Sequence, residues 1–179
     1  MRYLISLLAP ILLLIACAGN PVNAVPVTGF DQEKYLGTWY EVARLDHSFE
    51  RGLSHVSATY TRREDGKITV LNQGYKASSQ KTKAATGKAK FAADNTTGHL
   101  KVSFFGPFYG DYIIFDLDKP NYNYAYVSGG KDNYLWLLSR TPTITDSVRR
   151  DFLAKSEALG YETEDLIWVT HTSSTKAVN

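Results

Sequence analysis

The sequence predicts an all-β fold, an eight-stranded antiparallel up-and-down β-barrel with one C-terminal α-helix packed outside. Three observations support this prediction. Short segments that alternate between apolar and polar residues follow one another after Phe30, with turn residues between them. Aromatic residues make up 13% of the chain, and 12 of them are Tyr, as is typical of strand-rich proteins. One amphipathic segment of helical period follows the last of these strands.

Eight strands are expected along the middle of the chain. They cover residues 39–45, 56–62, 67–75, 86–92, 99–105, 111–118, 124–128 and 134–140. In the fifth of these strands, Leu100, Val102 and Phe104 alternate with polar residues. One apolar and one polar face, repeated over eight strands, suit a closed barrel, which just holds one small ligand. The small residues Gly87 and Ala89 are expected to leave interior room beside one wall.

The period changes after the eighth strand. Thr145 can cap a helix that begins at Asp146, and Gly160 can end it. Four residues share the buried face of this helix: Val148, Phe152, Ser156 and Leu159. A last short strand is expected over residues 167–170. The barrel domain therefore covers residues 30–172, followed by a C-terminal tail over residues 173–179.

The N-terminus has the pattern of an export signal. Residues 1–16 combine a basic start with an apolar run too short for an ordinary membrane-spanning helix. The run ends in Leu14-Ile15-Ala16-Cys17, which resembles the bacterial lipobox, whose cysteine is lipidated and becomes the new N-terminus. Ala18, in place of Asp, then implies the outer membrane. Residues 17–29 are expected to form a flexible tether. The alternative is a soluble secretory signal that is cleaved after Ala24.

Composition and motifs exclude several classes of function. The net charge is only +2, without long basic runs, so no nucleic acid partner is expected. Cys17 is the only cysteine, and the four histidines lack metal-ligand spacing, so neither a disulfide nor a metal or other cofactor is expected. No nucleophile motif or phosphate loop occurs, so the chain is not expected to be an enzyme. Glu41 shares parity with Trp39 and is expected to be an internal, hydrogen-bonded carboxylate.

Two distant motifs carry a resemblance to the lipocalin family. Gly37-Thr38-Trp39-Tyr40 looks like the G-x-W signature of the first lipocalin strand, and Arg140 looks like the arginine at the end of the eighth. The resemblance implies that Gly37, Trp39 and Arg140 are structural, with the guanidinium stacked on the indole at the closed end of the barrel.

The bacterial lipocalins and apolipoprotein D-like proteins are the closer match. The matching segments are residues 35–44 (YLGTWYEVAR), 49–53 (FERGL), 101–109 (KVSFFGPFY) and 134–142 (YLWLLSRTP). The resemblance implies a lipoprotein of the bacterial outer membrane that is anchored through Cys17 and faces the periplasm. It also implies a carrier that stores or transports a fatty acid or lysophospholipid for membrane maintenance under stress.

Two groups of residues are candidates for binding this lipid. Inside the barrel the candidates are Phe104, Tyr112, Trp136 and Leu138, unless these side chains only fill the core. At the open end the candidates are Phe49, Phe108 and Tyr109. Because surface aromatic residues also mark protein contacts, the open end has an alternative interpretation. In that case the protein is an envelope interaction or structural protein, and the open end is a homodimer or partner interface.

Overall fold

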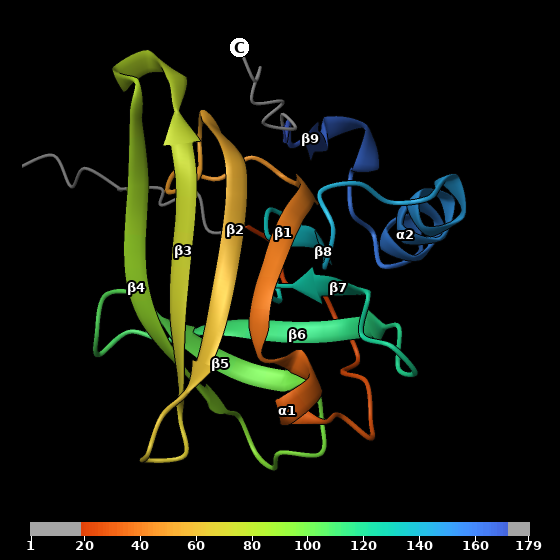
Figure 1. Cartoon of the computed structure of the whole chain (residues 1–179). Coiled ribbons are helices and arrows are strands. Elements are labelled where there is room, and N and C mark those ends of the chain that lie inside the picture. Colours follow the sequence, from red (N-terminus) through yellow and green to blue (C-terminus); the bar gives the residue numbers. More distant parts are fainter. Residues whose placement is uncertain (1–18, 172–179) are drawn as a thin grey trace, which may run out of the picture.

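The computed structural model describes residues 19–171, and Cys17 and the predicted signal peptide lie outside these residues. Eight antiparallel strands form the wall of a barrel (Figure 1). They are β1 (Gly37–Arg44), β2 (Leu53–Arg62), β3 (Ile68–Lys76), β4 (Lys81–Phe91), β5 (His99–Ser103), β6 (Gly110–Leu117), β7 (Tyr124–Ser128) and β8 (Leu135–Ser139). Each strand pairs with the next in the chain, and β1 pairs with both β2 and β8, which closes the ring. The predicted up-and-down barrel is confirmed.

Strand β1 changes neighbours along its length. Its first half, from Gly37 to Tyr40, pairs with β2, whereas Ala43 and Arg44 pair with the short strand β9 (Ile167–Trp168). The chain beyond β9 continues to β2, where the backbone N–H of His55 donates to the carbonyl of Thr170 at 2.9 Å. The C-terminal strand therefore covers the gap between β1 and β2 in one half of the barrel.

The two ends of the barrel differ. The connections β1–β2, β3–β4, β5–β6 and β7–β8 form one end, which we call the mouth, and the other connections form the floor. The β3–β4 hairpin is the longest and projects at the top of Figure 1, with the 3-10 helix η1 (Ala77–Ser79) at its tip. Strand β4 begins at Lys81, five residues before the predicted start, because its pairing with β3 continues to the end of this hairpin.

A short helix at the floor, α1 (Gln32–Tyr35), was not predicted from the sequence. Asp31 caps it, because its side chain accepts a hydrogen bond from the backbone N–H of Glu33. Tyr35, its last residue, is buried beneath the barrel, and its carbonyl accepts a hydrogen bond of 2.8 Å from the indole of Trp39. A helix of one turn has no recognisable apolar period, which explains why the sequence pattern did not reveal it.

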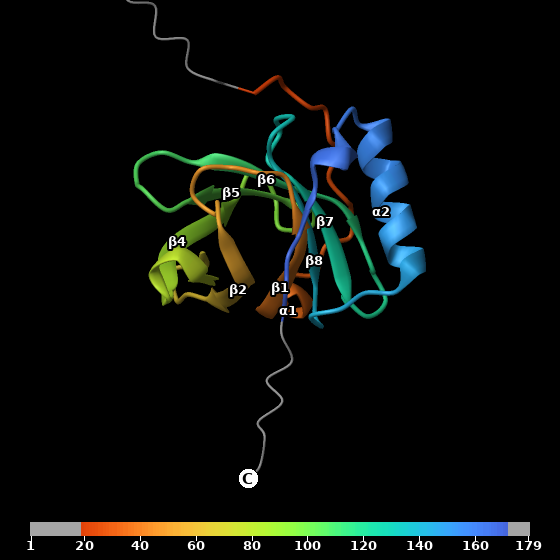
Figure 2. The ribbon, with the colours of Figure 1, turned by 90° about the horizontal axis from the view of Figure 1, so that it is seen from above.

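Helix α2 (Asp146–Ala158) packs on the outside of the barrel, as predicted (Figure 2). Phe152 and Ser156 are buried on its inner face, and the Phe152 ring lies 5.1 Å from the ring of Tyr126 on β7. The Tyr126 hydroxyl donates to the carbonyl of Val148 at 3.1 Å. No helix among residues 19–171 is long and apolar enough to cross a membrane.

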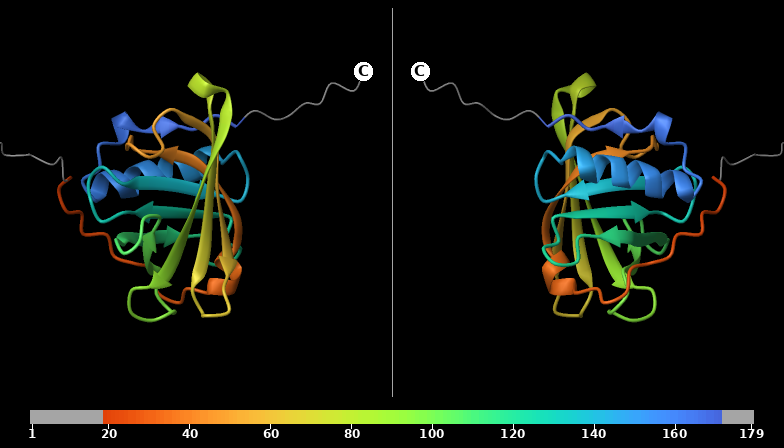
Figure 3. Two further views of the ribbon diagram at one scale, coloured as in Figure 1. Left: turned by 90° about the vertical axis from the view of Figure 1, so that its left-hand side faces the viewer. Right: turned by 90° about the vertical axis from the view of Figure 1, so that its right-hand side faces the viewer.

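The segment before the barrel is bound to the wall and does not match the expected flexible tether. Residues 20–29 run from the mouth to the floor along the outside of β6 and β7 (Figure 3). The backbone N–H of Val22 donates to Gly130 at 3.0 Å, and that of Val27 donates to Ile114 at 2.9 Å. Within this segment, Pro21 and Thr28 form isolated bridges and not a continuous ladder. The segment therefore lacks the alternating pattern by which strands are predicted.

The N-cap of α2 provides a test of local stability. The Thr145 hydroxyl accepts a hydrogen bond from the backbone N–H of Val148 at 3.4 Å. Thr145→Ala is therefore expected to lower the free energy of unfolding by about 1 kcal/mol in urea denaturation. Thr145→Ser keeps the hydroxyl and should retain most of this stability. Equal losses in both variants would show that the cap does not cause the effect.

Candidate functional site

The floor of the barrel is sealed by Arg140. Its guanidinium carbon lies 3.8 Å from the centre of the Trp39 ring. The same guanidinium donates to backbone carbonyls, including those of Thr38 at 2.8 Å and Lys34 at 2.7 Å. Gly37 has a φ of +92° and lies against the guanidinium, where an L side chain would strain the backbone. The three signature residues therefore lie together at the floor, where they stabilise the entrance into β1.

Three tyrosines divide the interior above this floor. The Tyr112 hydroxyl lies 2.7 Å from that of Tyr35 and 2.8 Å from that of Tyr60. Burial raises the pKa of all three phenols, so they remain neutral and act only as hydrogen-bonding groups. We call them the tyrosine trio. Because their hydroxyls bond to one another, the trio spans the interior just above the floor.

Part of the interior wall above the trio is formed by apolar side chains that are only partly buried. Strand register directs Ala58, Val102, Tyr112 and Trp136 inward, since each is paired with or packed against interior residues. All four remain partly exposed although they contact the buried core cluster. Leu138 faces the same interior but is only 4% exposed, so it belongs to the core wall. The interior between trio and mouth therefore presents accessible apolar side chains.

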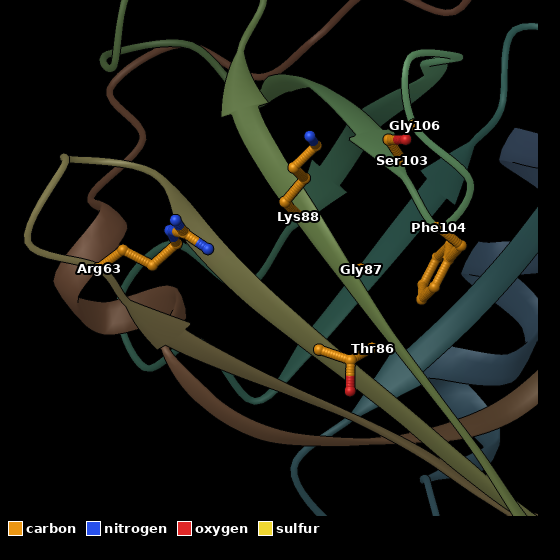
Figure 4. A pocket seen from close by; sticks show the side chains of 7 residues that line it. All are labelled: Arg63, Thr86, Gly87, Lys88, Ser103, Phe104 and Gly106. Carbon is orange, nitrogen blue, oxygen red and sulfur yellow. The ribbon is translucent and has the colours of Figure 1, made fainter.

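Phe104 occupies the space beside Gly87. A Cβ atom at Gly87 would lie 2.8 Å from the Phe104 ring, and Figure 4 shows the ring directed toward this glycine. The room that Gly87 was expected to leave is thus taken by Phe104. A shallow hollow of about 290 Å³ lies at the same place. Its lining residues are Arg63, Thr86, Gly87, Lys88, Ser103, Phe104 and Gly106.

A buried charged cluster lies inside the barrel on the mouth side, and of its members the sequence predicted only Glu41 as an internal, hydrogen-bonded carboxylate. Arg44 is 1% exposed, and its Nη1 donates to the Glu41 carboxylate at 2.6 Å. Its Nη2 donates to the carbonyls of Glu50 at 3.0 Å and Leu53 at 3.2 Å. A β-bulge between Glu41 and Ala43 places Arg44 on the interior face, against the simple alternation of β1. Arg44 therefore fixes the β1–β2 connection over the interior.

Glu50 joins this cluster from the β1–β2 connection. Its carboxylate lies 2.8 Å from the His47 ring and accepts a hydrogen bond of 3.1 Å from the indole of Trp136. Burial opposes ionisation of Glu50, but hydrogen bonding and charge from His47 and the bond from Trp136 lower its pKa below the usual value. In Glu41, burial and the nearby Glu50 outweigh Arg44 and raise the pKa well above its usual value.

The predicted mouth residues lie in different surroundings. Phe49 is 52% exposed, and its ring lies 4.0 Å from that of His47. Phe108 is 78% exposed on the β5–β6 connection. Tyr109 lies on the outer wall, because the ammonium groups of Lys88 and Lys90, on the outward face of β4, lie over its ring at 5.7 and 4.8 Å. Among residues 19–171, no group of three or more His, Cys, Asp and Glu residues could hold a metal ion.

Comparison with known proteins decides the family. The family model of the lipocalin-like domain matches residues 30–171. The chain is a lipocalin. It is 53% identical over 169 residues to the outer membrane lipoprotein Blc of Vibrio cholerae, covering 94% of this chain and 98% of the relative. It is 46% identical over 164 residues to the protein of the same name from Escherichia coli K12, covering 90% and 92%. The predicted bacterial subgroup and the outer-membrane location are confirmed.

The fold of this lipocalin also occurs in distant relatives. Insecticyanin from the tobacco hornworm Manduca sexta matches with a TM-score of 0.70, at 20% identity, over 87% of this chain and 88% of its own. At this identity the likeness shows the fold alone. The family and the accessible apolar interior together support the binding of a hydrophobic ligand inside the barrel.

Proposed function

We propose that this lipocalin carries a fatty acid or lysophospholipid in the upper half of its barrel and serves membrane maintenance under stress. The observation that carries this proposal is the set of inward side chains that contact the core and yet remain partly exposed: Ala58, Val102, Phe104, Tyr112 and Trp136. An acyl chain that lies against these residues removes both its own surface and theirs from water.

The magnitudes suit a carrier. Burial of roughly 12 methylenes at about 0.8 kcal/mol each yields roughly 10 kcal/mol. Association costs several kcal/mol of this, which leaves an affinity in the micromolar range and allows release. The tyrosine trio sets the depth of the acyl chain, and the polar end of the lipid then lies near the mouth. There the buried Nε of Arg44 has no protein acceptor among the described residues.

The arrangement favours a carrier over an enzyme. The buried acids Glu41 and Glu50 are held by Arg44, Trp136 and His47, so they act as structural partners. We therefore assign the interior to binding, with Phe104, Tyr112 and Trp136 as the contacts of the acyl chain.

Filling the interior tests the proposal. Ala58→Phe adds a ring on the inward face of β2, in the space assigned to the acyl chain, and is expected to weaken lysophospholipid affinity at least about tenfold. The matched control is Thr61→Phe on the same strand, since Thr61 is exposed on the outward face and should leave affinity unchanged. Affinity is measured by titration calorimetry, and circular dichroism verifies the fold.

Tryptophan fluorescence locates the ligand. Trp136 faces the interior near the mouth, whereas Trp168 lies outside the barrel, where the guanidinium of Arg149 stacks on it at 3.9 Å. The emission change on lipid binding should therefore vanish largely in Trp136→Phe and persist in Trp168→Phe. If micromolar lipid leaves the wild-type spectrum unchanged and Ala58→Phe behaves as the wild type does, the interior is a filled core and the proposal is wrong.

A further inference from the structure

Exposed apolar side chains gather at the mouth of the barrel. Five large apolar residues among the described part of the chain are exposed, and only Val25 lies on the wall segment away from the mouth-side ends of the strands. Phe105 and Phe108 on the β5–β6 connection are each 78% exposed. Phe49, on the β1–β2 connection, stacks on Tyr134 of the β7–β8 connection at 6.2 Å. Such a concentration of exposed aromatic rings marks a surface that contacts a membrane or another protein.

The mouth also carries uncompensated positive charge. From Gly66 to Ala93 the chain contains six lysines and no acidic residue. Three of these, Lys76, Lys81 and Lys83, flank the tip of the β3–β4 hairpin, and none of them takes part in an ion pair among residues 19–171.

The floor differs from the mouth in the pairing of its charged residues. There Arg62 pairs with Glu33 at 2.6 Å, and Asp65 pairs with both Arg63 and Lys67 at 3.0 Å. Arg62, Arg63 and Lys67 at the floor are thus neutralised by neighbouring carboxylates, whereas the three lysines at the hairpin tip are not. The mouth is therefore the end of the barrel that attracts an anionic surface.

The N-terminal segment leaves the barrel at the mouth as well. The side chain of Asn20 donates to Asp132 at 2.7 Å, and its carbonyl accepts from the backbone N–H of the same residue at 2.9 Å. Asp132 belongs to the β7–β8 connection, as does Gly130, whose carbonyl accepts a hydrogen bond from the backbone N–H of Val22. The described part of the chain therefore begins beside the mouth, two residues after Cys17.

We propose that the mouth of the barrel lies on the bilayer, with the rings of Phe49, Phe105 and Phe108 at the boundary between headgroups and acyl chains and the hairpin lysines on anionic lipid phosphates. This inference rests on the proposed lipid carriage and on lipidation of Cys17. A ligand then passes between the bilayer and the barrel interior without crossing water, and the floor points away from the membrane.

Site-specific quenching tests the orientation of the lipidated protein. The protein is extracted from bacterial membranes and reconstituted in vesicles of phosphatidylethanolamine and phosphatidylglycerol at about seven to three. Because acylated Cys17 has no free thiol, Phe105→Cys at the mouth and Lys119→Cys at the floor each introduce a unique labelling site. A fluorophore at each position is then challenged with phospholipid whose acyl chains carry a bromine quencher.

The expected result is quenching at Phe105→Cys at least about threefold stronger than at Lys119→Cys. Equal quenching at the two positions, or stronger quenching at the floor, overturns the proposal. Absence of quenching at both positions together with energy transfer between labels at Phe105→Cys also overturns it, because a second copy of the chain then covers the mouth. The tryptophan titration reports lipid binding separately. If quenching does not show the mouth on the bilayer but the tryptophan titration shows normal lipid binding, only this inference is refuted. If lipid binding is absent as well, the proposed carrier function is also refuted.

Charge variants test whether the lysines at the mouth, and not the total charge of the protein, place the mouth on the bilayer. The triple variant Lys76→Gln/Lys81→Gln/Lys83→Gln removes three charges at the mouth and should reduce quenching at Phe105→Cys at least about twofold. Added salt should weaken the quenching that remains. The matched control, Lys34→Gln/Lys67→Gln/Lys119→Gln, removes three charges at the floor and should leave quenching at Phe105→Cys unchanged. Equal effects of the two triple variants contradict a docked mouth.

Discussion

Replacement of Arg44 by methionine is expected to lower the free energy of unfolding by about 3–5 kcal/mol at neutral pH, as is usual when one partner of a buried ion pair is removed. Arg44 is the only described cation in contact with the Glu41 carboxylate, and it also binds the carbonyls of Glu50 and Leu53. Its loss leaves buried oxygens without donors and frees the β1–β2 connection. Equilibrium unfolding in urea measures the effect.

The pH dependence identifies the cause of this loss. The pKa of Glu41 is already raised, and without Arg44 it rises further, so the folded variant binds more protons than the unfolded chain above the usual glutamate pKa. The stability of Arg44→Met should therefore fall, relative to wild type, as the pH rises above the usual glutamate pKa. The control Glu41→Gln/Arg44→Met removes the carboxylate and should recover part of the stability and lose most of this pH dependence. If the stability that Arg44→Met loses relative to wild type does not change with pH, the unpaired Glu41 carboxylate is not the cause of the loss.

The sequence predicted the strands because their faces differ. In β5 the alternation of Leu100 and Val102 with Lys101 and Ser103 specifies which side is buried, and closure follows from eight strands with two different faces. The alternation fails in β1, where the bulge after Glu41 turns Arg44 inward. A bulge is set by the pairing with β8 and leaves no mark in the sequence of one strand.

The candidate site was predictable in part for the same reason. Parity indicated that Tyr112 and Trp136 face the interior, but it carries no information about connections. His47 and Glu50 belong to a loop of mixed polarity, and only its folding over the interior brings them to Trp136. Tyr109 was expected at the mouth because it lies in the predicted loop over residues 106–110, yet the two lysines of β4 hold its ring on the outer wall.

Arg140→Ala is expected to lower the free energy of unfolding by about 3 kcal/mol, which is more than a cation–π contact alone contributes. The guanidinium donates to four carbonyls: those of Lys34, Leu36, Thr38 and Tyr122. Removing it deprives these carbonyls of their donor and exposes one face of the Trp39 indole at the floor. Arg140→Lys is the control, because a lysine keeps the charge but cannot reach four carbonyls, and it should recover less than half of the loss.

The same substitution separates stability from ligand binding. Arg140 lies below Tyr35, whose hydroxyl bond to Tyr112 stands between the floor and the space assigned to the acyl chain. Lysophospholipid affinity of Arg140→Ala, measured below its unfolding transition, should therefore stay within about twofold of wild type, since distant sites act independently. Hydrogen exchange should accelerate first at α1, whose last carbonyls lose their donor. If affinity instead falls at least about tenfold while stability is unchanged, Arg140 binds the ligand and the barrel is entered from the opposite end.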